Sequence, residues 1–561
     1  MPESKSKFLV PAISTAIVVA GGIAVYMYLK SPTGDSSSPL GSAKVVPANA
    51  LIATYINTDD QSWNKLRQFG NPQAQQLITK SLEDVNKELL SGSNISYETD
   101  IKPWVGGVMI AVLPPTPPTP TPPTPTPPNA PIKPKQEPNI LLVVGIKDKL
   151  SALNFSKKLK EQKNLQTEES DYKGQKIIAS KSKGKSTYTT VLNNSQLLLA
   201  PEKQALEKAI DTYKGEPSFA TKEGASSILS KGVDVKNSLA QIYVPDYANM
   251  AQQLTALNPQ ARPLPPQTLA QLKQVKSMVA GIGVDDAGLR LKAVVNLDPQ
   301  LSKFQYQTTP AKIVGQFPSD TFALVTGQNI NRSWQTLVEQ SKDYPELKQV
   351  IEQTRGQLQQ FANLDLDKDI FGWMNQEFAL GAVKSSQGWL ANVGFGGAIV
   401  FDTSDRKTAE ATFTKLDDLA KKQSLNVAQK SIGGKNITEW QIPQQGALVA
   451  HGWLDQDTVF LAIGGPVGET LADKKGQSLD NTDTFKSVTG SLQKPNAGYF
   501  YLDMDNTTSL ITRFATAGQP LPPEASAILS SIRGIGVTVN SPDKSTSQME
   551  MLLSLKPATA K

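Results

Sequence analysis

A run rich in proline and threonine, PPTPPTPTPPTPTPPNAP, occupies residues 114–131 and lies between two apolar segments, GGVMIAVL and NILLVVGI. The length and composition of these two segments predict neighbouring β-strands. Proline fixes φ and lacks a backbone N–H, so the run can continue neither a helix nor a sheet and favours extended polyproline II structure. We therefore predict a disordered surface loop, residues 114–138, that connects two strands of one sheet.

Short motifs recur in the same order in the two halves of the chain. PANALIATYINTDDQSW resembles PSDTFALVTGQNINRSW, an acidic turn precedes a tryptophan in each half, and GIGV occurs twice. Tryptophan at such positions predicts a core residue, and glycine within a strand predicts close backbone approach. The matched residues that we interpret as structural anchors are Trp63 and Trp334, Trp104 and Trp373, and Gly281 and Gly534.

Strands outnumber helices in each half, and most of the connections between strands are short, as in the segments YKGQKIIAS, STYTTVL and SQLLLA. Short connections favour antiparallel pairing, and partial alternation of apolar and polar residues predicts a sheet with one wet face. The predicted fold is α+β, with two tandem similar copies over residues 45–300 and 316–558 and a linker at 301–315. Each copy is expected to be a large, mostly antiparallel sheet with helices on one face.

The N-terminal segment FLVPAISTAIVVAGGIAVYMYL, residues 8–29, contains no charged residue. A helix of about 20 apolar residues spans the ~30 Å hydrocarbon core of a bilayer. We predict a transmembrane anchor that contacts the lipid bilayer, preceded by a short cytoplasmic N-terminus, residues 1–7, and followed by a flexible linker, residues 30–44. A cleaved signal peptide is the alternative. The predicted localisation is a single-pass membrane protein with its bulk in the periplasm or thylakoid lumen.

Composition excludes several classes of chemistry. The chain has no cysteine and one histidine, His451, so disulfides, thiolate catalysis and zinc sites are not expected. A Ser-His-Asp triad could form only around His451, which lies in a predicted strand. The formal net charge is +6, and no aromatic residues are interleaved with lysines in the way that single-strand nucleic-acid binding requires. We predict no nucleic-acid partner and no cofactor.

An acidic turn is the one candidate metal site. Asp365, Asp367 and Asp369 begin like a calcium loop, but Ile370 stands at the sixth position and Gln376 at the twelfth, where glycine and glutamate are needed. We interpret the turn as the cap of a structural element, with a weak cation site as the alternative. Ser-x-x-Lys recurs at scattered positions without the partner motifs of serine acyl-enzymes, so no catalytic residue is predicted.

The uncharged N-terminal segment and polar linker, followed by VPANALIATYINTDDQSW and DIKPWVGG, resemble the bacterial domain of unknown function family 3352, which is common in cyanobacteria. The resemblance covers most of residues 45–558. It implies an anchored, exported protein, and it supplies no catalytic residue.

These observations predict a non-catalytic, membrane-anchored exported protein that binds or scaffolds an unknown protein or envelope partner at the outer face of a bacterial membrane. Two alternatives stay open. The first is an envelope-associated hydrolase that uses serine or carboxylate groups, for which a deep pocket with convergent titratable groups is expected. The second is a purely structural spacer.

Overall fold

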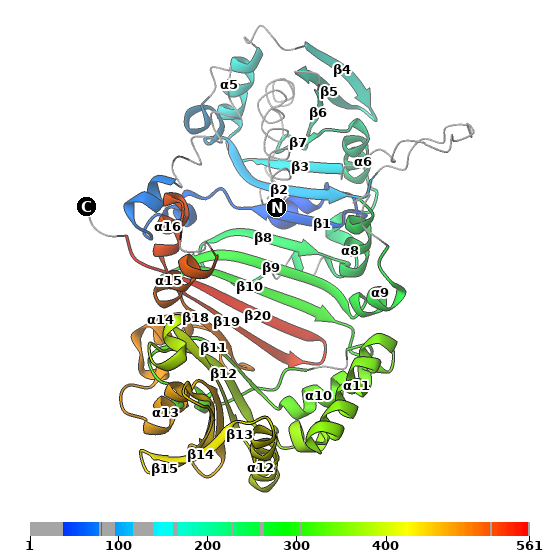
Figure 1. The fold of residues 1–561 in the computed structure, drawn as a ribbon. Helices are drawn as coiled ribbons and strands as arrows, with labels where there is room; N and C mark the ends of the chain where they lie inside the picture. Colours follow the sequence, from blue (N-terminus) through cyan, green and yellow to red (C-terminus); the bar gives the residue numbers. More distant parts are fainter. Residues whose placement is uncertain are drawn as a thin grey trace, which may run out of the picture. The chain divides into compact units, whose positions relative to one another are not determined.

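Figure 1 shows the chain as a computed structural model. The structure describes residues 38–77, 80, 96–115, 139–160, 166–182, 185–225, 228–229, 232–257, 263–302, 305–515 and 519–558. The predicted bilayer contact at residues 8–29 lies outside the described residues, as do residues 116–138 of the predicted proline-rich loop.

The described helices bear on the predicted localisation. None of them is long and apolar enough to cross a membrane. The longest of them, α11 (Pro345–Ala362), has 18 residues and the polar sequence PELKQVIEQTRGQLQQFA, whereas a span needs about 20 mostly apolar residues. The predicted single-pass membrane protein with its bulk in the periplasm or thylakoid lumen is thus not borne out by any described helix, and we withdraw that prediction.

The twenty strands of the described chain belong to one hydrogen-bonded sheet. Every strand pair described below is antiparallel. The prediction of two tandem copies, residues 45–300 and 316–558, each with a sheet of its own after a membrane helix, is therefore wrong. The α+β composition and the antiparallel pairing are as predicted. Motif matches compare side chains and do not report which strand edges pair, so they cannot distinguish one continuous sheet from two.

The described chain divides into two compact units, and the division passes through a strand. β10 (Gly288–Leu297) contributes residues to both units. The first unit takes in the described residues up to Gln68 and those within Gln75–Asp285 and Leu291–Leu301. The second takes in Phe69–Ala74, Asp286–Arg290 and the described residues from Ser302 onward.

In the first unit, β1 pairs with β2 and β8, β2 with β3, and β3 with β7, while β4 to β7 form a meander. β8 pairs with β9. The strands are β1 (Ile52–Ile56), β2 (Val105–Leu113), β3 (Asn139–Ile146), β4 (Gln166–Tyr172), β5 (Gln175–Ser182), β6 (Lys185–Leu192), β7 (Gln196–Ala200), β8 (Ser238–Val244) and β9 (Val275–Asp285). The helices and helical turns are α2 (Pro39–Ala43), α3 (Asp60–Leu66), η2 (Tyr97–Ile101), α5 (Lys149–Lys160), α6 (Lys203–Tyr213), η3 (Phe219–Thr221), α8 (Tyr247–Ala256) and α9 (Pro266–Leu272).

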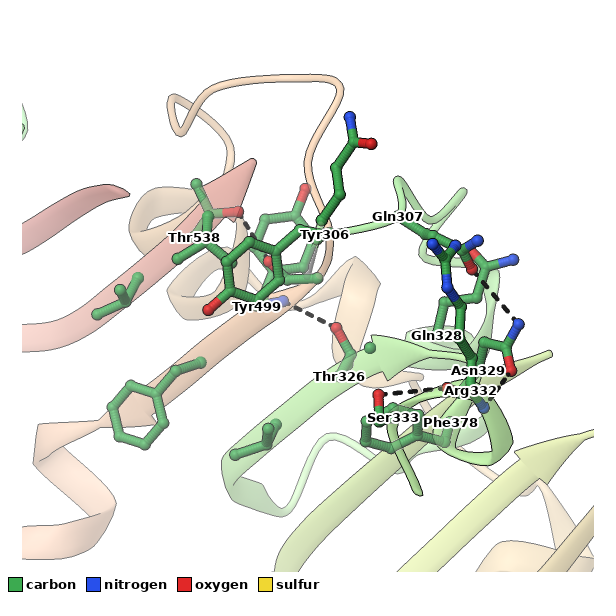
Figure 2. Close-up of a pocket in the computed structure, with 18 residues that line it drawn as sticks. Tyr306, Gln307, Thr326, Gln328, Asn329, Arg332, Ser333, Phe378, Tyr499 and Thr538 are labelled. Carbon is green, nitrogen blue, oxygen red and sulfur yellow. Dashed lines mark hydrogen bonds between the residues drawn. The ribbon is translucent and has the colours of Figure 1, made fainter. Parts of the chain in front are cut away.

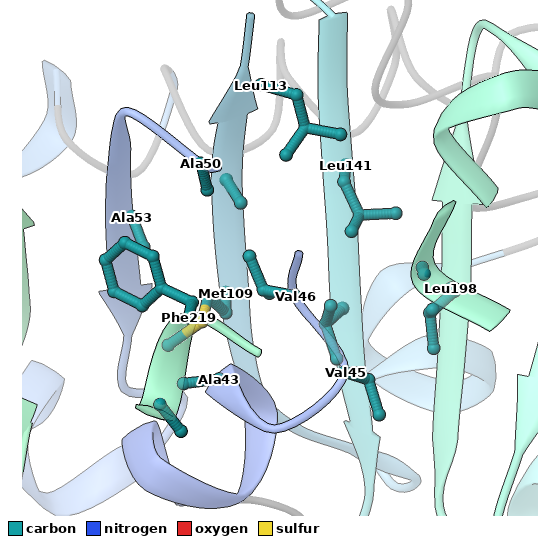
Figure 3. Packing of buried hydrophobic residues seen from close by; sticks show 14 of the residues in the cluster. Ala43, Val45, Val46, Ala50, Ala53, Met109, Leu113, Leu141, Leu198 and Phe219 are labelled. Carbon is teal, nitrogen blue, oxygen red and sulfur yellow. The ribbon is translucent and has the colours of Figure 1, made fainter. Parts of the chain in front are cut away.

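Apolar residues bury both faces of β3 and β7 in the first unit. Leu141 and Leu198 pack with the segment after α2 and with α6 on one face, where Figure 3 shows them beside Met109 and Val46. Leu142, Val144, Leu197 and Leu199 pack on the other face with α5, through Ala152 and Phe155. The prediction of helices on one face alone is wrong here. The uninterrupted apolar runs NILLVVGI and QLLLA are typical of strands buried on both sides.

In the second unit, the strand order is β14–β15–β16–β17–β13–β12–β11–β18–β19–β20. The strands are β11 (Thr321–Gln328), β12 (Glu377–Lys384), β13 (Phe395–Asp402), β14 (Asn426–Ile432), β15 (Lys435–Ile442), β16 (Gly446–Trp453), β17 (Thr458–Ile463), β18 (Tyr499–Asp503), β19 (Ile532–Asp543) and β20 (Thr546–Leu555). The remaining helices and turns are η4 (Lys312–Gln316), α10 (Ile330–Ser341), η5 (Leu366–Ile370), η6 (Gly388–Asn392), α12 (Arg406–Lys422), α13 (Gly465–Asp473), η7 (Leu479–Asn481), α14 (Asp483–Thr489), α15 (Met504–Ala515) and α16 (Pro523–Ser530).

The two faces of this second-unit sheet are covered unequally. One face packs against η4, α13 and α14 around Leu324, Ala379 and Tyr501. On the opposite face, Phe413 of α12 packs with Trp373 and with residues of β13 and β17. On that face Val325 of β11 and Phe500 of β18 stay 44% and 40% exposed, and the candidate site lies beside them.

Candidate functional site

A pocket opens in the second unit where two paired strands diverge. β11 pairs with β18 only as far as Val325, which lies opposite Phe500. Beyond that point β11 continues along β12 to Gln328, while β18 begins along β19 at Tyr499. The space between the diverging ends is the mouth of the pocket.

The two strands make their last contact at Thr326, where the regular pairing has ended. The Tyr499 N–H donates to the side-chain hydroxyl of Thr326 at 2.8 Å rather than to a backbone carbonyl. Gly498 has φ +123°, and a Cβ at this position would lie 2.2 Å from the Thr326 carbonyl oxygen. Only glycine combines this φ with so close an approach. Gly498 therefore permits the close contact with Thr326 at the point where the regular pairing of β11 and β18 ends.

The pocket encloses about 290 Å³ and has a polar side and an aromatic side (Figure 2). Gln307, Gln328, Asn329 and Arg332 lie on one side, and Tyr306 and Tyr499 lie on the other. Most of the other lining residues come from β11, β18 and β19. The eighteen lining residues are Gln305, Tyr306, Gln307, Val325, Thr326, Gly327, Gln328, Asn329, Arg332, Ser333, Phe378, Ala497, Gly498, Tyr499, Phe500, Val537, Thr538 and Val539.

The polar side is organised by the short turn from β11 into α10. Asn329 adopts a left-handed conformation (φ 59°), which asparagine tolerates better than most residues, and its Oδ1 caps α10 by accepting from the Arg332 N–H at 2.9 Å. Asn329 Nδ2 donates to Gln307 Oε1 at 3.4 Å. Among the residues that the structure describes, none forms an ion pair with the exposed Arg332 guanidinium. Gln328 Oε1 is buried and accepts no hydrogen bond from any described group.

The wall that carries Tyr306 is fastened to β12 by a buried carboxylate. Glu377 is 4% exposed, and its Oε1 accepts from the Ala311 N–H at 2.6 Å and from the Thr309 hydroxyl. Its Oε2 accepts from the Ile313 N–H at 3.2 Å. Burial raises the pKa of Glu377, although the backbone N–H donors act in the opposite direction. Glu377 therefore positions the segment that closes one side of the pocket.

The carboxylates of the acidic turn, which we interpreted as a structural cap with a weak cation site as the alternative, are bonded to protein groups. Asp365 Oδ1 accepts from the Asp367 and Lys368 N–H groups at 2.9 and 3.0 Å. Asp369 Oδ2 accepts from the Asp365 N–H at 2.9 Å and pairs with Lys415 Nζ at 2.7 Å. Within the described part of the chain, no cluster of three metal-ligating side chains occurs. The turn therefore caps η5 and anchors α12.

The third carboxylate of this turn ties α10 and α11 together. Asp367 accepts from Arg355 Nε and Nη2, both at 2.8 Å, and from Trp334 Nε1 at 2.7 Å. The hydrogen bond from Arg355 lowers the pKa of Asp367. Trp334 is half-buried and stacks on Phe371, with ring centroids 4.3 Å apart.

The other predicted anchors occupy different environments. Trp104 and Trp373 are buried, and each indole donates to the carbonyl of an aspartate four residues earlier, at 2.8 and 2.9 Å. Trp63 is 39% exposed and donates to the Asn57 carbonyl at 2.7 Å. It is thus a surface residue rather than a core residue.

The two predicted glycine anchors lie in strands where space is short. A Cβ on Gly534 in β19 would lie 2.6 Å from the Leu502 carbonyl oxygen, and one on Gly281 in β9 would lie 3.3 Å from Val233. None of the predicted anchors and none of the three aspartates lines the pocket.

His451 is buried in β16, with its Nε2 2.8 Å from Asp417 Oδ1, and Phe413 stacks on the imidazole at 4.7 Å. Asp417 also accepts from Trp440 Nε1 at 2.6 Å. Burial raises the pKa of Asp417, but the hydrogen bonds from His451 and Trp440 outweigh it and hold the pKa below its usual value. Among described residues no serine hydroxyl bonds to the imidazole, so no Ser-His-Asp triad is assembled.

Sequence reasoning missed the residues that form the pocket. Arg332 lies two residues before Trp334, in the segment NINRSW, which was compared for its tryptophan alone. A signal was available there, because an arginine that follows an Asn cap at the start of a helix projects near the end of the preceding strand.

The model of one protein family, described as "Protein of unknown function (DUF3352)", matches residues 12–555. This match agrees with the resemblance that the sequence motifs indicated. Crystal form III of TP0453 is similar over 46% of this chain and 79% of that chain, with 9% identity and a TM-score of 0.26. Crystal form IV is similar over 45% and 79%, with 9% identity and a TM-score of 0.25. Similarity of this size assigns neither a fold nor a function, and no curated protein matches the chain.

Proposed function

We propose that this chain, which belongs to the family described as "Protein of unknown function (DUF3352)", is a non-catalytic binding protein. In this proposal the second unit holds a partner on the exposed part of this sheet face, in and beside the pocket. The observation that carries the proposal is a row of apolar side chains, three exposed and one half-buried, that crosses four neighbouring strands and ends in the pocket.

We call Leu380, Val325, Phe500 and Val537 the apolar row. The register places Leu380 opposite Val325, Val325 opposite Phe500, and Phe500 opposite Val537, so the four side chains lie side by side on one face. Leu380, Val325 and Phe500 are 41%, 44% and 40% exposed. Three of the four, all except Leu380, also line the pocket.

An exposed row of this kind is unusual on a surface that serves only to keep the protein in solution. Large apolar groups gathered on a soluble surface mark a binding site more often than scattered ones do. The adjacent residues of the same strands, such as Leu324 and Tyr501, already fill the core on the opposite face, so the row is not needed to complete that core. A structural spacer gives no reason to expose it.

The pocket chemistry favours binding over hydrolysis. Among the described residues that line it, none carries a carboxylate or an imidazole. Ser333 Oγ donates to the Asn329 carbonyl at 3.4 Å and has no base beside it. Nucleophilic catalysis needs such a base within hydrogen-bonding distance of the hydroxyl. The lining supplies orientation and apolar contact instead, which are the properties of a ligand pocket.

The test uses 8-anilinonaphthalene-1-sulfonate, an anionic aromatic dye whose fluorescence rises on apolar surfaces, with the full chain in its native state. Val325→Thr/Phe500→Thr keeps residues that favour strands and removes the exposed apolar groups. We expect the affinity for the dye to fall about 10-fold, since more than 1 kcal/mol of apolar contact is lost. The matched control is Val350→Gln/Phe361→Gln on α11, where both residues are also exposed. Equal dye binding by the wild type and the row variant would refute the proposal.

A further inference from the structure

We infer that the pocket receives the free C-terminus of a partner polypeptide that ends in an apolar residue. The terminal carboxylate binds Arg332, a backbone N–H of the same chain end donates to Gln328, and the last side chain lies against the aromatic rings. This inference rests on the proposed function, because the body of the partner then lies along the apolar row.

The charge of the pocket selects an anionic group. Arg332 is the one ionisable cation among the described lining residues, and no lining carboxylate neutralises it. Its guanidinium is exposed and forms no ion pair within the described chain. A guanidinium presents two parallel N–H donors that match the two oxygens of a carboxylate. An anionic group bound here would form an ion pair with Arg332 on the polar side of the pocket.

Gln328 favours a ligand that carries a hydrogen-bond donor beside its anionic group. Gln328 Oε1 is a buried acceptor without a partner among the described residues, and Gln328 comes four residues before Arg332 at the same polar side of the pocket (Figure 2). A buried acceptor that stays unpaired costs free energy, so a ligand that brings a donor is favoured. Sulfate and phosphodiester groups bring acceptors only. A peptide C-terminus brings a carboxylate and an amide N–H within one residue.

The remaining surface selects an apolar end residue. Tyr306, Phe378 and Tyr499 line the pocket together with the apolar residues of the row. A volume of about 290 Å³ is near the lower end of the range for ligand pockets, roughly 300–1,000 Å³. It therefore accommodates the end of a chain rather than a folded segment. Because the pocket opens onto the apolar row, the residues that precede the terminus have a surface on which to lie.

The experiment measures fluorescence anisotropy of a labelled hexapeptide, Gly-Ser-Gly-Ser-Val-Phe, as the free acid and as the C-terminal amide. With the full wild-type chain we expect the free acid to bind about 10-fold more tightly than the amide, as a charge-assisted bidentate contact implies. Arg332→Gln should bring this ratio to about 1, and Arg332→Lys should retain part of it, because charge remains but the fork is lost. Lys348→Gln, on the exposed surface of α11, is the matched control and should leave the ratio unchanged.

Three outcomes would overturn the inference. Equal binding of the acid and the amide by the wild type would exclude recognition of the terminus. An N-acetylphenylalanine competitor as potent as the hexapeptide would show that the ligand is a small free acid and not a chain end. No peptide binding while the dye still binds would exclude a polypeptide partner and leave the proposed function standing. Failure of the proposed function is distinguished by the row variant, which would then bind dye and peptide as the wild type does.

Discussion

A buried ion pair in the second unit offers a sharp test of its packing. Arg290 Nη1 lies 2.5 Å from Glu550 Oε1, and the two side chains are only 9% and 4% exposed. Arg290 Nη2 donates to Ser491 Oγ at 2.8 Å, and Glu550 Oε2 accepts from the Gln493 N–H at 2.7 Å. Each charge therefore has both an ionic and a neutral partner.

The expected cost of removing one charge follows from these distances. Two unit charges 2.5 Å apart attract by about 7 kcal/mol at an effective dielectric constant of ~20. Desolvation costs several kcal/mol per ion, so the intact pair contributes little net stability. Glu550→Gln removes the attraction and leaves Arg290 buried, so we expect the free energy of unfolding to fall by about 3–5 kcal/mol. Arg290→Met/Glu550→Leu removes both charges and should recover most of that loss.

The assay is urea-induced unfolding followed by tryptophan fluorescence. Arg290→Met and Glu550→Leu are added, so that the wild type, these two single variants and the double variant form a double-mutant cycle. The control is Glu339→Gln, because Glu339 also lies 2.5 Å from its lysine but both side chains are at least 60% exposed. We expect that control to cost at most about 0.5 kcal/mol. A loss for Glu550→Gln no larger than that of the control would refute the reasoning.

Three further predictions concern single residues. Gly498→Ala forces a Cβ against a carbonyl at positive φ, and should lower the free energy of unfolding by about 2 kcal/mol and weaken dye binding. Asp367→Asn should cost about 0.5–1 kcal/mol at pH 7, since Asp367 is partly exposed. The Arg355 hydrogen bond lowers the pKa of Asp367 in the folded chain, so Asp367 stabilises the fold above its unfolded pKa and loses that effect as pH falls through its folded pKa. The free energies of unfolding of the wild type and of Asp367→Asn should therefore converge in acid. Trp104→Ala should cost about 3–5 kcal/mol by thermal or urea unfolding, and Trp63→Ala, at an exposed site, clearly less.

Local features of the fold followed from the sequence. The two apolar segments around the proline run were predicted as neighbouring strands, and β2 and β3 pair directly. The antiparallel pairing predicted for the segments YKGQKIIAS, STYTTVL and SQLLLA is confirmed by the pairs β5–β6 and β6–β7. These features depend on apolar runs and short connections, which are properties of adjacent residues. Pairing of this kind needs little information from the rest of the chain.

Long-range features did not follow from the sequence. The continuity of the sheet depends on which strand edges pair. The burial of both faces of β3 depends on α5 and α6, which pack against opposite faces of that strand. The pocket depends on Gly498 and Thr326, which are far apart in sequence and meet only where β11 and β18 diverge. Arg332 is a candidate binding residue because it lines this pocket and has no ionic partner in the described chain. Neither property can be read from the motif NINRSW.

The pocket owes its opening to the course of two backbones and not to small side chains. Substitutions at Tyr306 or Phe378 would therefore change which ligand end fits without closing the opening, since neither residue belongs to the β11–β18 pairing that ends at Val325. The lining residues can be substituted one at a time while the backbone of β11 and β18 keeps its conformation. A site constructed in this way lends itself to changes of specificity, and a small library at these two lining positions is a practical route to new ligands.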